Sequence, residues 1–246
     1  MPSGRLLAAA LLSAGLLVSG GTARAQTTDR ARAAAEIESL REQIKAREAV
    51  LLAPPEEDRK AYAEFLARPD TGLVRLLPRE KWGNKLSLNG GGAYYSFERL
   101  THDYGYGSDV QLEQNQFSVG FAGADFGFMV NLGDVPLENV SAETEAVQFM
   151  ASFKAPSAEA EARASYRQFG GGDGHTAGPW TYRSRLPAVA GNTYALRSIN
   201  YGDSDLLVAF RVARKDADGS VVLLWRLLEK YPKPALRRDA GPAAGS

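Results

Sequence analysis

The chain has 246 residues, no cysteine, and equal numbers of basic and acidic residues, 29 of each. Without cysteine, neither a disulfide nor a cysteine-linked lipid anchor can form, so the fold must be stabilised by its core. The balanced charge argues against a protein that binds nucleic acid or an anionic membrane surface.

The first 25 residues have the pattern of a secretory signal peptide. The basic Arg5 precedes an apolar run from Leu6 to Val18, and the small-residue sequence Ala23-Arg24-Ala25 follows. An apolar run of this length is shorter than the roughly 18 to 20 residues that a membrane-spanning helix needs. We therefore expect an exported protein, periplasmic or secreted, with no integral membrane span after the signal is removed.

Residues 26–78 are predicted to be a helical segment. Apolar residues recur at helical spacing in its first part, at Ile37, Leu40, Ile44 and Leu51. Pro54-Pro55 ends this helix, and the acidic residues after it favour the start of a second one. The apolar stripe predicts either a helix docked on its own domain or a short coiled coil. In the second case a homo-oligomer would form through Ile37, Leu40 and Ile44, although Arg47 occupies one position of the stripe.

Residues 79–234 are predicted to form an antiparallel β-sandwich, with a closed β-barrel as the alternative. Short apolar runs alternate with turns rich in Gly, Asn and Asp, and two pairs of runs look like hairpins. The first pair is 117–121 with 126–132, and the second is 205–215 with 220–228 around Asp216-Ala217-Asp218-Gly219. A short exposed helix over Ala155 to Gln168 interrupts the strands, and residues 235–246 are expected to be a disordered tail.

The most distinctive stretch is GGGAYYSFERLTHDYGYGSD, from Gly90 to Asp109. If it is extended, alternation places one set of side chains on a common face, namely Tyr94, Glu98, His102, Tyr104 and Tyr106. Aromatic rings stack on sugar rings and polar groups bond hydroxyls, so this face, with Trp180 from another loop, predicts a ligand-binding surface. The alternative is an ordinary strand packed on the core.

Signals for catalysis or for a metal are weaker. Glu98, Asp103, Asp109 and Glu113 would be the source of two carboxylates for glycoside hydrolysis. The only two histidines, His102 and His175, are far apart in the sequence and form no metal-ligand motif. The Asp216 to Gly219 stretch resembles the start of a calcium loop but lacks the later glutamate, and a hairpin turn explains it fully. We therefore expect no metal and no cofactor.

These observations favour an exported binding or interaction protein, with carbohydrate or a cell-envelope component as its partner. The alternative is a structural envelope protein that oligomerises through the N-terminal helix. An exported hydrolase is the third hypothesis, and it requires the acidic residues named above to converge in a cleft.

Overall fold

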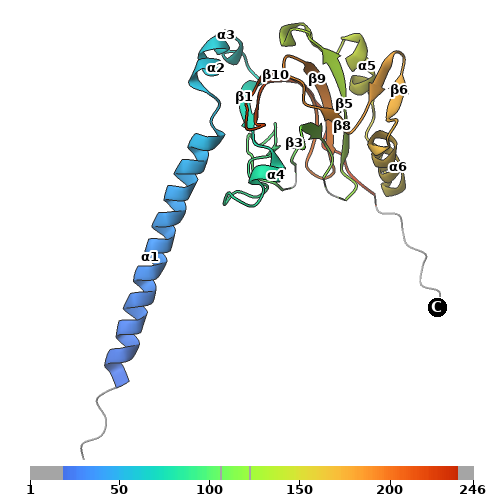
Figure 1. Ribbon diagram of the computed structural model, residues 1–246. Helices are drawn as coiled ribbons and strands as arrows, with labels where there is room; N and C mark the ends of the chain where they lie inside the picture. The colour runs from blue at the N-terminus through green and yellow to red at the C-terminus, as the bar shows by residue number, and fades with distance from the viewer. Residues whose placement is uncertain (1–18, 106, 122, 238–246) are drawn as a thin grey trace, which may run out of the picture. The chain divides into compact units, whose positions relative to one another are not determined.

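The computed structural model describes residues 19–105, 107–121 and 123–237 (Figure 1). The chain divides into two compact units, Met1–Arg47 and Glu48–Ser246. Most of the predicted signal peptide lies outside the described residues, as do Tyr106 and most of the predicted tail. Within the described part of the chain, no helix combines the length and the apolar character needed to cross a membrane.

The first helix, α1, covers Ser19–Leu52 and ends before the two prolines, as the sequence predicts. In its described part the apolar stripe is exposed: Ile37, Leu40 and Ile44 each keep about half of their surface accessible, at 51%, 57% and 47%. Helices α2 (Glu56–Ala61) and α3 (Ala63–Leu66) follow, and α2 begins with the acidic triplet Glu56, Glu57 and Asp58. Negative charge there complements the positive end of the helix dipole.

The second unit is built on a five-stranded antiparallel sheet with the order β1-β11-β10-β9-β5. Its strands are β1 (Thr71–Leu76), β5 (Phe126–Gly133), β9 (Thr193–Asn200), β10 (Ser204–Lys215) and β11 (Val221–Lys230). The β10–β11 hairpin confirms the second predicted pairing, with Phe210 opposite Trp225. Strand β1 was not predicted, because its six residues are too few to distinguish the apolar spacing of a strand from that of a helix.

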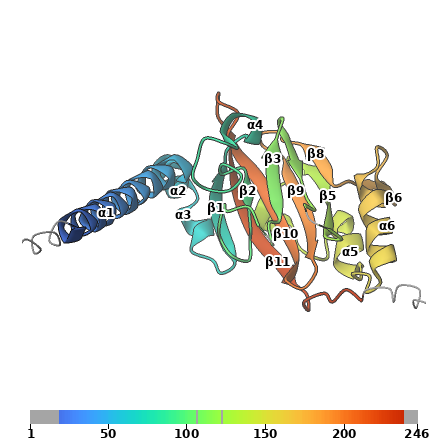
Figure 2. The same ribbon diagram turned by 90° about the horizontal axis from the view of Figure 1, so that it is seen from below.

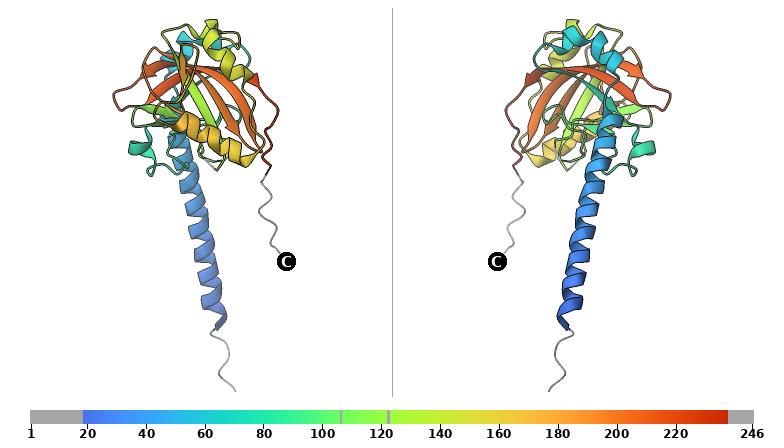
Figure 3. Two further views of the ribbon diagram at one scale, coloured as in Figure 1. Left: turned by 90° about the vertical axis from the view of Figure 1, so that its right-hand side faces the viewer. Right: turned by 90° about the vertical axis from the view of Figure 1, so that its left-hand side faces the viewer.

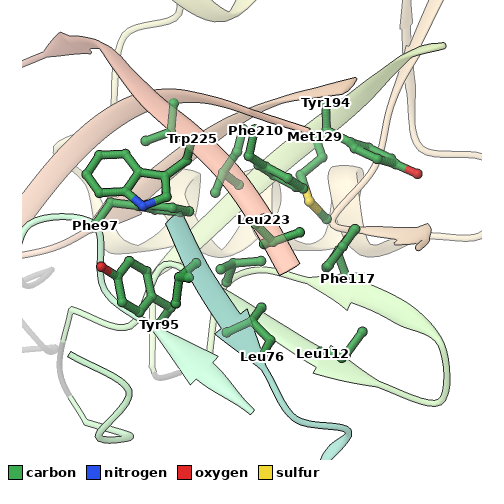
Figure 4. Packing of buried hydrophobic residues seen from close by; sticks show 14 of the residues in the cluster. Leu76, Tyr95, Phe97, Leu112, Phe117, Met129, Tyr194, Phe210, Leu223 and Trp225 are labelled. Carbon is green, nitrogen blue, oxygen red and sulfur yellow. The ribbon is translucent and has the colours of Figure 1, made fainter. Parts of the chain in front are cut away.

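A smaller antiparallel sheet packs on one face of the large sheet, in the order β2-β3-β4-β8. Its strands are β2 (Tyr94–Tyr95), β3 (Val110–Glu113), β4 (Gln116–Ser118) and β8 (Arg185–Pro187). In Figure 2 the small sheet is seen against the large one, and Phe117 of β4 contacts Tyr194 of β9 and Phe210 of β10. The two sheets enclose a core in which the rings of Tyr95, Phe97 and Trp225 meet (Figure 4). The sheets do not close into a barrel, so the sandwich-like prediction is confirmed and the barrel alternative is wrong.

The other face of the large sheet is covered by helices and by a two-stranded ribbon. These are α5 (Glu145–Ser152), α6 (Glu159–Gly170), β6 (His175–Ala177) and β7 (Trp180–Tyr182), which face the viewer on the left of Figure 3. Phe65 of α3 joins the same apolar cluster. Two short helices, α4 (Arg79–Trp82) and the 3-10 helix η1 (Leu137–Asn139), connect strands. Because β9 and most of β10 are buried on both faces, the large sheet forms the centre of three layers.

The first predicted hairpin is wrong. Strand β4 pairs with β3 and β8 in the small sheet, whereas β5 pairs with β9 in the large sheet. A tight turn decides this pairing: Gln114 and Asn115, between β3 and β4, both have positive φ, at 49° and 61°. Two such residues form the turn whose twist matches a two-residue hairpin loop, so β4 returns along β3.

Two boundaries also differ from the sequence-based expectation. Strand β1 lies inside the segment 26–78 that was expected to be helical. The described beginning of the expected tail, residues 235–237, is attached to the fold: Leu236 packs against the helix-side core, and the amide of Arg237 donates to the Ser157 carbonyl at 2.7 Å. The segment was expected to be disordered because its apolar residues show no periodicity, but the single side chain of Leu236 is enough to attach it.

Candidate functional site

The outer face of the small sheet carries one continuous row of side chains that bear polar groups. Tyr94 of β2 lies opposite Gln111 of β3, and Gln111 lies opposite Ser118 of β4. Ser118 in turn lies opposite Arg185 of β8. Residues that pair directly across strands point to the same face, so these four side chains share one face of the sheet. The neighbouring register Leu112, Phe117 and Leu186 points the other way, into the core between the sheets.

A groove of about 510 Å³ opens on this face, within the size range of small-molecule sites. Its floor includes Gln111, Ser118 and Arg185 of the row. The last two turns of α6 line it with Tyr166 and Arg167, and Phe121 lines it from the segment that follows β4. Tyr166 is 47% exposed, so its ring is available to a ligand.

Gln111 leaves one hydrogen-bonding group unused at the floor of the groove. Its side chain is only 4% exposed, and its Oε1 accepts a bond of 3.1 Å from the hydroxyl of Ser118. Its Nε2, in contrast, is buried and has no partner among the residues that the structure describes. An unsatisfied buried amide costs about 1–3 kcal/mol, so this position is energetically unfavourable until an acceptor reaches it.

The groove is positively charged. Among the described residues that line it are two arginines, Arg167 and Arg185, and no aspartate or glutamate. In the described part of the chain neither guanidinium takes part in an ion pair, whereas Arg163, one turn earlier on α6, is paired with Glu159 at 2.6 Å. The groove therefore offers hydrogen-bond donors and positive charge to whatever enters it.

The aromatic stretch of the sequence places only some of its residues together. The rings of Tyr94 and Tyr104 lie 4.4 Å apart, and Phe121, which lines the groove, contacts Tyr94 at 5.2 Å. Tyr104 is 39% exposed, whereas Tyr94 is buried beneath Gly90 and the guanidinium of Arg79. Burial raises the pKa of Tyr94. The Tyr94–Tyr104 pair thus adjoins one end of the groove.

The expected alternation along the whole stretch is wrong. Strand β2 has only two residues, and Leu100, with φ 53°, reverses the chain in a turn closed by the Ser96–Thr101 bridge. Glu98 is directed to Lys230, with which it forms an ion pair. His102 packs on Tyr95, on the core side of the sheet, and its Nε2 donates to the Arg75 carbonyl at 2.8 Å. Glu98 and His102 therefore do not join Tyr94 and Tyr104, and Tyr106 lies outside the described residues.

Trp180 does not join this face either. It lies on β7 and packs against the apolar cluster between the large sheet and the helices. The large sheet therefore separates Trp180 from the Tyr94–Tyr104 pair, and the two cannot frame one groove. Its indole nitrogen is buried and finds no hydrogen-bond partner in the described part of the chain.

The four acidic residues proposed for hydrolysis do not converge. Glu98 is paired with Lys230, and Glu113 is paired with Arg79 at 3.0 Å. Asp103 accepts from the amide of Asn89 at 3.2 Å, and Asp109 is buried in the interior. None of the four lines the groove. The paired carboxylates that glycoside hydrolysis requires are therefore not formed by these residues.

Asp109 instead connects the two sheets. Its Oδ2 accepts from the Phe97 amide at 2.7 Å, and its Oδ1 accepts from Nδ2 of Asn200 on β9 at 3.1 Å. Burial raises the pKa of its carboxyl group to about 6, although the hydrogen bonds from Ser198, Phe97 and Asn200 act in the opposite direction. The carboxyl group thus holds the start of the loop that carries Tyr104.

The histidines and the Asp216–Gly219 stretch form no metal site. Across the residues that the structure describes, no group of three or more His, Asp or Glu side chains is placed to hold a metal ion. His175 stacks on Phe149, far in the sequence from His102. Asp216 is paired with Arg75 and Arg214, and the amide of Gly219 donates to the Asp216 carbonyl, so this stretch is a hairpin turn.

Sequence reasoning missed most of the groove. Gln111 and Ser118 look like ordinary polar positions of two short strands, and Tyr166 and Arg167 like the exposed face of a helix. The alternation of Gln111 with Val110 and Leu112 was the available signal, because it places an amide on the outer face. Only the strand order β2-β3-β4-β8 brings Gln111 and Ser118 into one row with Tyr94 and Arg185.

Fold and groove together define a β-sandwich-like protein with a positively charged groove on its outer layer. The sequence matches no protein-family model, and it has no match among curated proteins or solved structures.

Proposed function

We propose that this chain is an exported binding protein that takes a saccharide of the cell envelope or its surroundings in the groove on the small sheet. The observation that carries the proposal is the buried amide of Gln111. This residue lines the groove, and its amide nitrogen has no partner within residues 19–105, 107–121 and 123–237. A buried donor without an acceptor is unfavourable in the free protein and becomes satisfied when a ligand hydroxyl or carboxylate reaches it.

The aromatic residues around the groove support a saccharide as the ligand. Tyr166 and Phe121 line it, and Tyr104 lies at the adjoining end against Tyr94. Flat rings with polar tips contact the apolar faces of sugar rings and bond their hydroxyl groups. Of the ligand-binding surface that the sequence predicts, Tyr94 and Tyr104 therefore remain in the proposed site. The proposed site also extends along the small sheet to α6.

The test is a thermal melt of the purified chain against a panel of envelope and plant polysaccharides. A ligand present at 100 times its dissociation constant adds about 2.7 kcal/mol, which moves the midpoint of a domain of this size by several degrees. We expect Tyr166→Ala and Tyr104→Ala to weaken binding of the active glycan about tenfold or less, as the loss of one ring contact predicts. Tyr166→Phe keeps the ring and is the matched control. Unchanged affinity in both alanine variants, together with a lower melting temperature, contradicts the proposal.

A second function, self-association through α1, is favoured by the exposed stripe Ile37, Leu40 and Ile44. In heptad terms these residues occupy a, d and a positions. In a parallel pair of such helices, Glu36 at g lies near Arg41 at e of the second copy, which is an attractive pair. The exposed apolar stripe and this one charge pair are what favour a second copy of the same helix as its partner.

Light scattering tests self-association. We expect the chain that begins at Gln26 to be larger than a monomer and a version that begins at Pro54 to be monomeric. Ile44→Lys should dissociate the oligomer, because it places a charge at the centre of the stripe. Arg47→Leu should strengthen it, because it completes the apolar pattern. Equal oligomeric states for the two lengths refute self-association through this helix.

A further inference from the structure

We infer that the groove selects saccharides that carry a carboxylate, such as oligomers of uronic acids. This inference rests on the proposed function and specifies the ligand class of the same site. Its first support is the charge of the lining: Arg167, near the end of α6, and Arg185, on β8, both line the groove.

The two guanidinium groups are available because nothing within the described residues neutralises them. Two other arginines are engaged instead: Arg163 of α6 pairs with Glu159, and Arg79 pairs with Glu113 of β3. An arginine fork matches the geometry of a carboxylate and bonds it in a bidentate fashion. Two such forks that line one groove, without a competing carboxylate, favour an anionic group on the ligand.

The uncharged side chains that line the groove also favour a carboxylate on the ligand. The oxygen of the Gln111 amide already accepts the Ser118 hydroxyl, so its free group is the Nε2 donor. A ligand that fits must therefore bring acceptors. A carboxylate is an acceptor at both oxygens, whereas a sugar hydroxyl is both donor and acceptor and has less to gain here.

The aromatic walls distinguish a saccharide from a free inorganic anion. Phosphate or sulfate would use the arginines but would leave the rings of Tyr166 and Phe121 without a contact. A uronic acid can contact both the aromatic rings and the arginines, since its pyranose ring offers an apolar face and its carboxylate projects from the ring edge. A groove of about 510 Å³ accommodates a short oligomer rather than a single small ion.

The experiment is a calorimetric titration of the purified chain with oligomers of galacturonate, glucuronate and mannuronate. Neutral oligomers of the same length, inorganic phosphate and sulfate are titrated in parallel. We expect at least one acidic oligomer to bind about tenfold or more tightly than its neutral counterpart, with an affinity that falls as salt is added. Arg167→Gln and Arg185→Gln should each reduce that affinity about tenfold, because each removes a charge-assisted contact.

Arg163→Gln is the matched control, because it removes the same charge from the same helix at a position outside the groove. Gln111→Met separates a binding role from a structural one. It removes the orphan donor at similar volume but also the acceptor of the Ser118 hydroxyl, so it should change the melting temperature little while the affinity for the acidic oligomer falls. A lower melting temperature with unchanged affinity assigns Gln111 to the fold and overturns its part in the site.

The outcomes separate the two proposals. Neutral and acidic oligomers that bind equally well, with no effect of the arginine variants, overturn acid selection and leave saccharide binding in place. Phosphate or sulfate that binds as tightly as the best oligomer, with the same dependence on Arg167 and Arg185, overturns the saccharide as ligand. No binding by any oligomer overturns both proposals.

Discussion

The buried carboxyl group of Asp109 makes the stability of the fold depend on pH in a defined direction. Burial raises the pKa of this group from 3.8 to about 6 in the folded chain. The folded protein therefore binds more protons than the unfolded protein between these two values, and its free energy of unfolding falls as the pH rises through them. The stabilising contribution is complete below about pH 3.8 and is lost by pH 7.

The magnitude follows from the difference in pKa. One pKa unit corresponds to about 1.4 kcal/mol, so a rise from 3.8 to about 6 gives a loss of about 3 kcal/mol between pH 3.5 and 7. In a domain of this size that is a change of about 6–12 °C in the melting temperature. Asp109→Asn keeps an oxygen for the Phe97 amide but does not titrate, so it should lack this contribution.

The assay is urea unfolding of the wild-type chain and of Asp109→Asn at half-unit steps from pH 3.5 to 7. The quantity to compare is the difference between the two unfolding free energies at each pH, because the other titrating groups cancel in it. We expect this difference to shift by about 3 kcal/mol against the wild type as the pH rises. A difference that stays flat, or that shifts in favour of the wild type, refutes the reasoning and means that the carboxylate is solvated or paired more strongly than its contacts indicate.

Two further predictions concern the core. Arg197 and Asp205 form a buried ion pair with bonds of 2.6 and 3.0 Å, so Arg197→Met leaves a buried carboxylate unpaired and should lower the free energy of unfolding in urea by about 3–5 kcal/mol. The double variant Arg197→Met with Asp205→Leu should recover most of that loss. A single variant as stable as the double variant contradicts this prediction. A Cβ on Gly72 would lie 2.6 Å from the indole of Trp225, so Gly72→Ala should cost about 1–3 kcal/mol. Gly170→Ala, with its nearest atom at 3.7 Å, is the control and should be neutral or slightly stabilising.

The parts of the fold that local pattern determines were predictable from the sequence. The β10–β11 hairpin consists of two long apolar runs joined by a short turn that contains Asp218-Gly219, so its pairing followed directly. The end of α1 before Pro54 followed from the chemistry of proline. The sandwich-like class followed from several short alternating runs, because such strands need a second layer to bury one face.

The pairing of strands that are distant in the sequence was not predictable in this way. Strand β8 lies next to β4 although almost 70 residues separate Ser118 from Arg185. Each of these strands has only three residues, and three residues do not specify a partner through alternation. The helix α5 was missed for a related reason: its buried residues Ala146, Val147 and Met150 acquire their meaning only when the large sheet supplies the surface that they cover.

The candidate site depends on the same long-range register. Tyr94 was singled out on composition, and the structure keeps it beside Tyr104, but Glu98 and His102 leave that face because Leu100 turns the chain. Composition identifies residue types that suit a ligand, whereas only the pairing of strands decides which of them share a face.

The position of the groove follows from the layers. Strands β9 and β10 in the large sheet are covered on both faces, so their side chains serve packing, as the buried Arg197–Asp205 pair does. The outer face of the small sheet has polar groups at positions that are nearly as buried: Gln111 is 4% exposed and Ser118 is 9% exposed. The fold uses Gln111 only in part: its amide oxygen accepts the Ser118 hydroxyl, but its amide nitrogen has no partner in the described chain. A buried position whose hydrogen-bonding capacity the fold leaves partly unused is where a ligand should be sought. Here that position lines the same groove as an exposed tyrosine and two arginines that form no ion pair within the described residues.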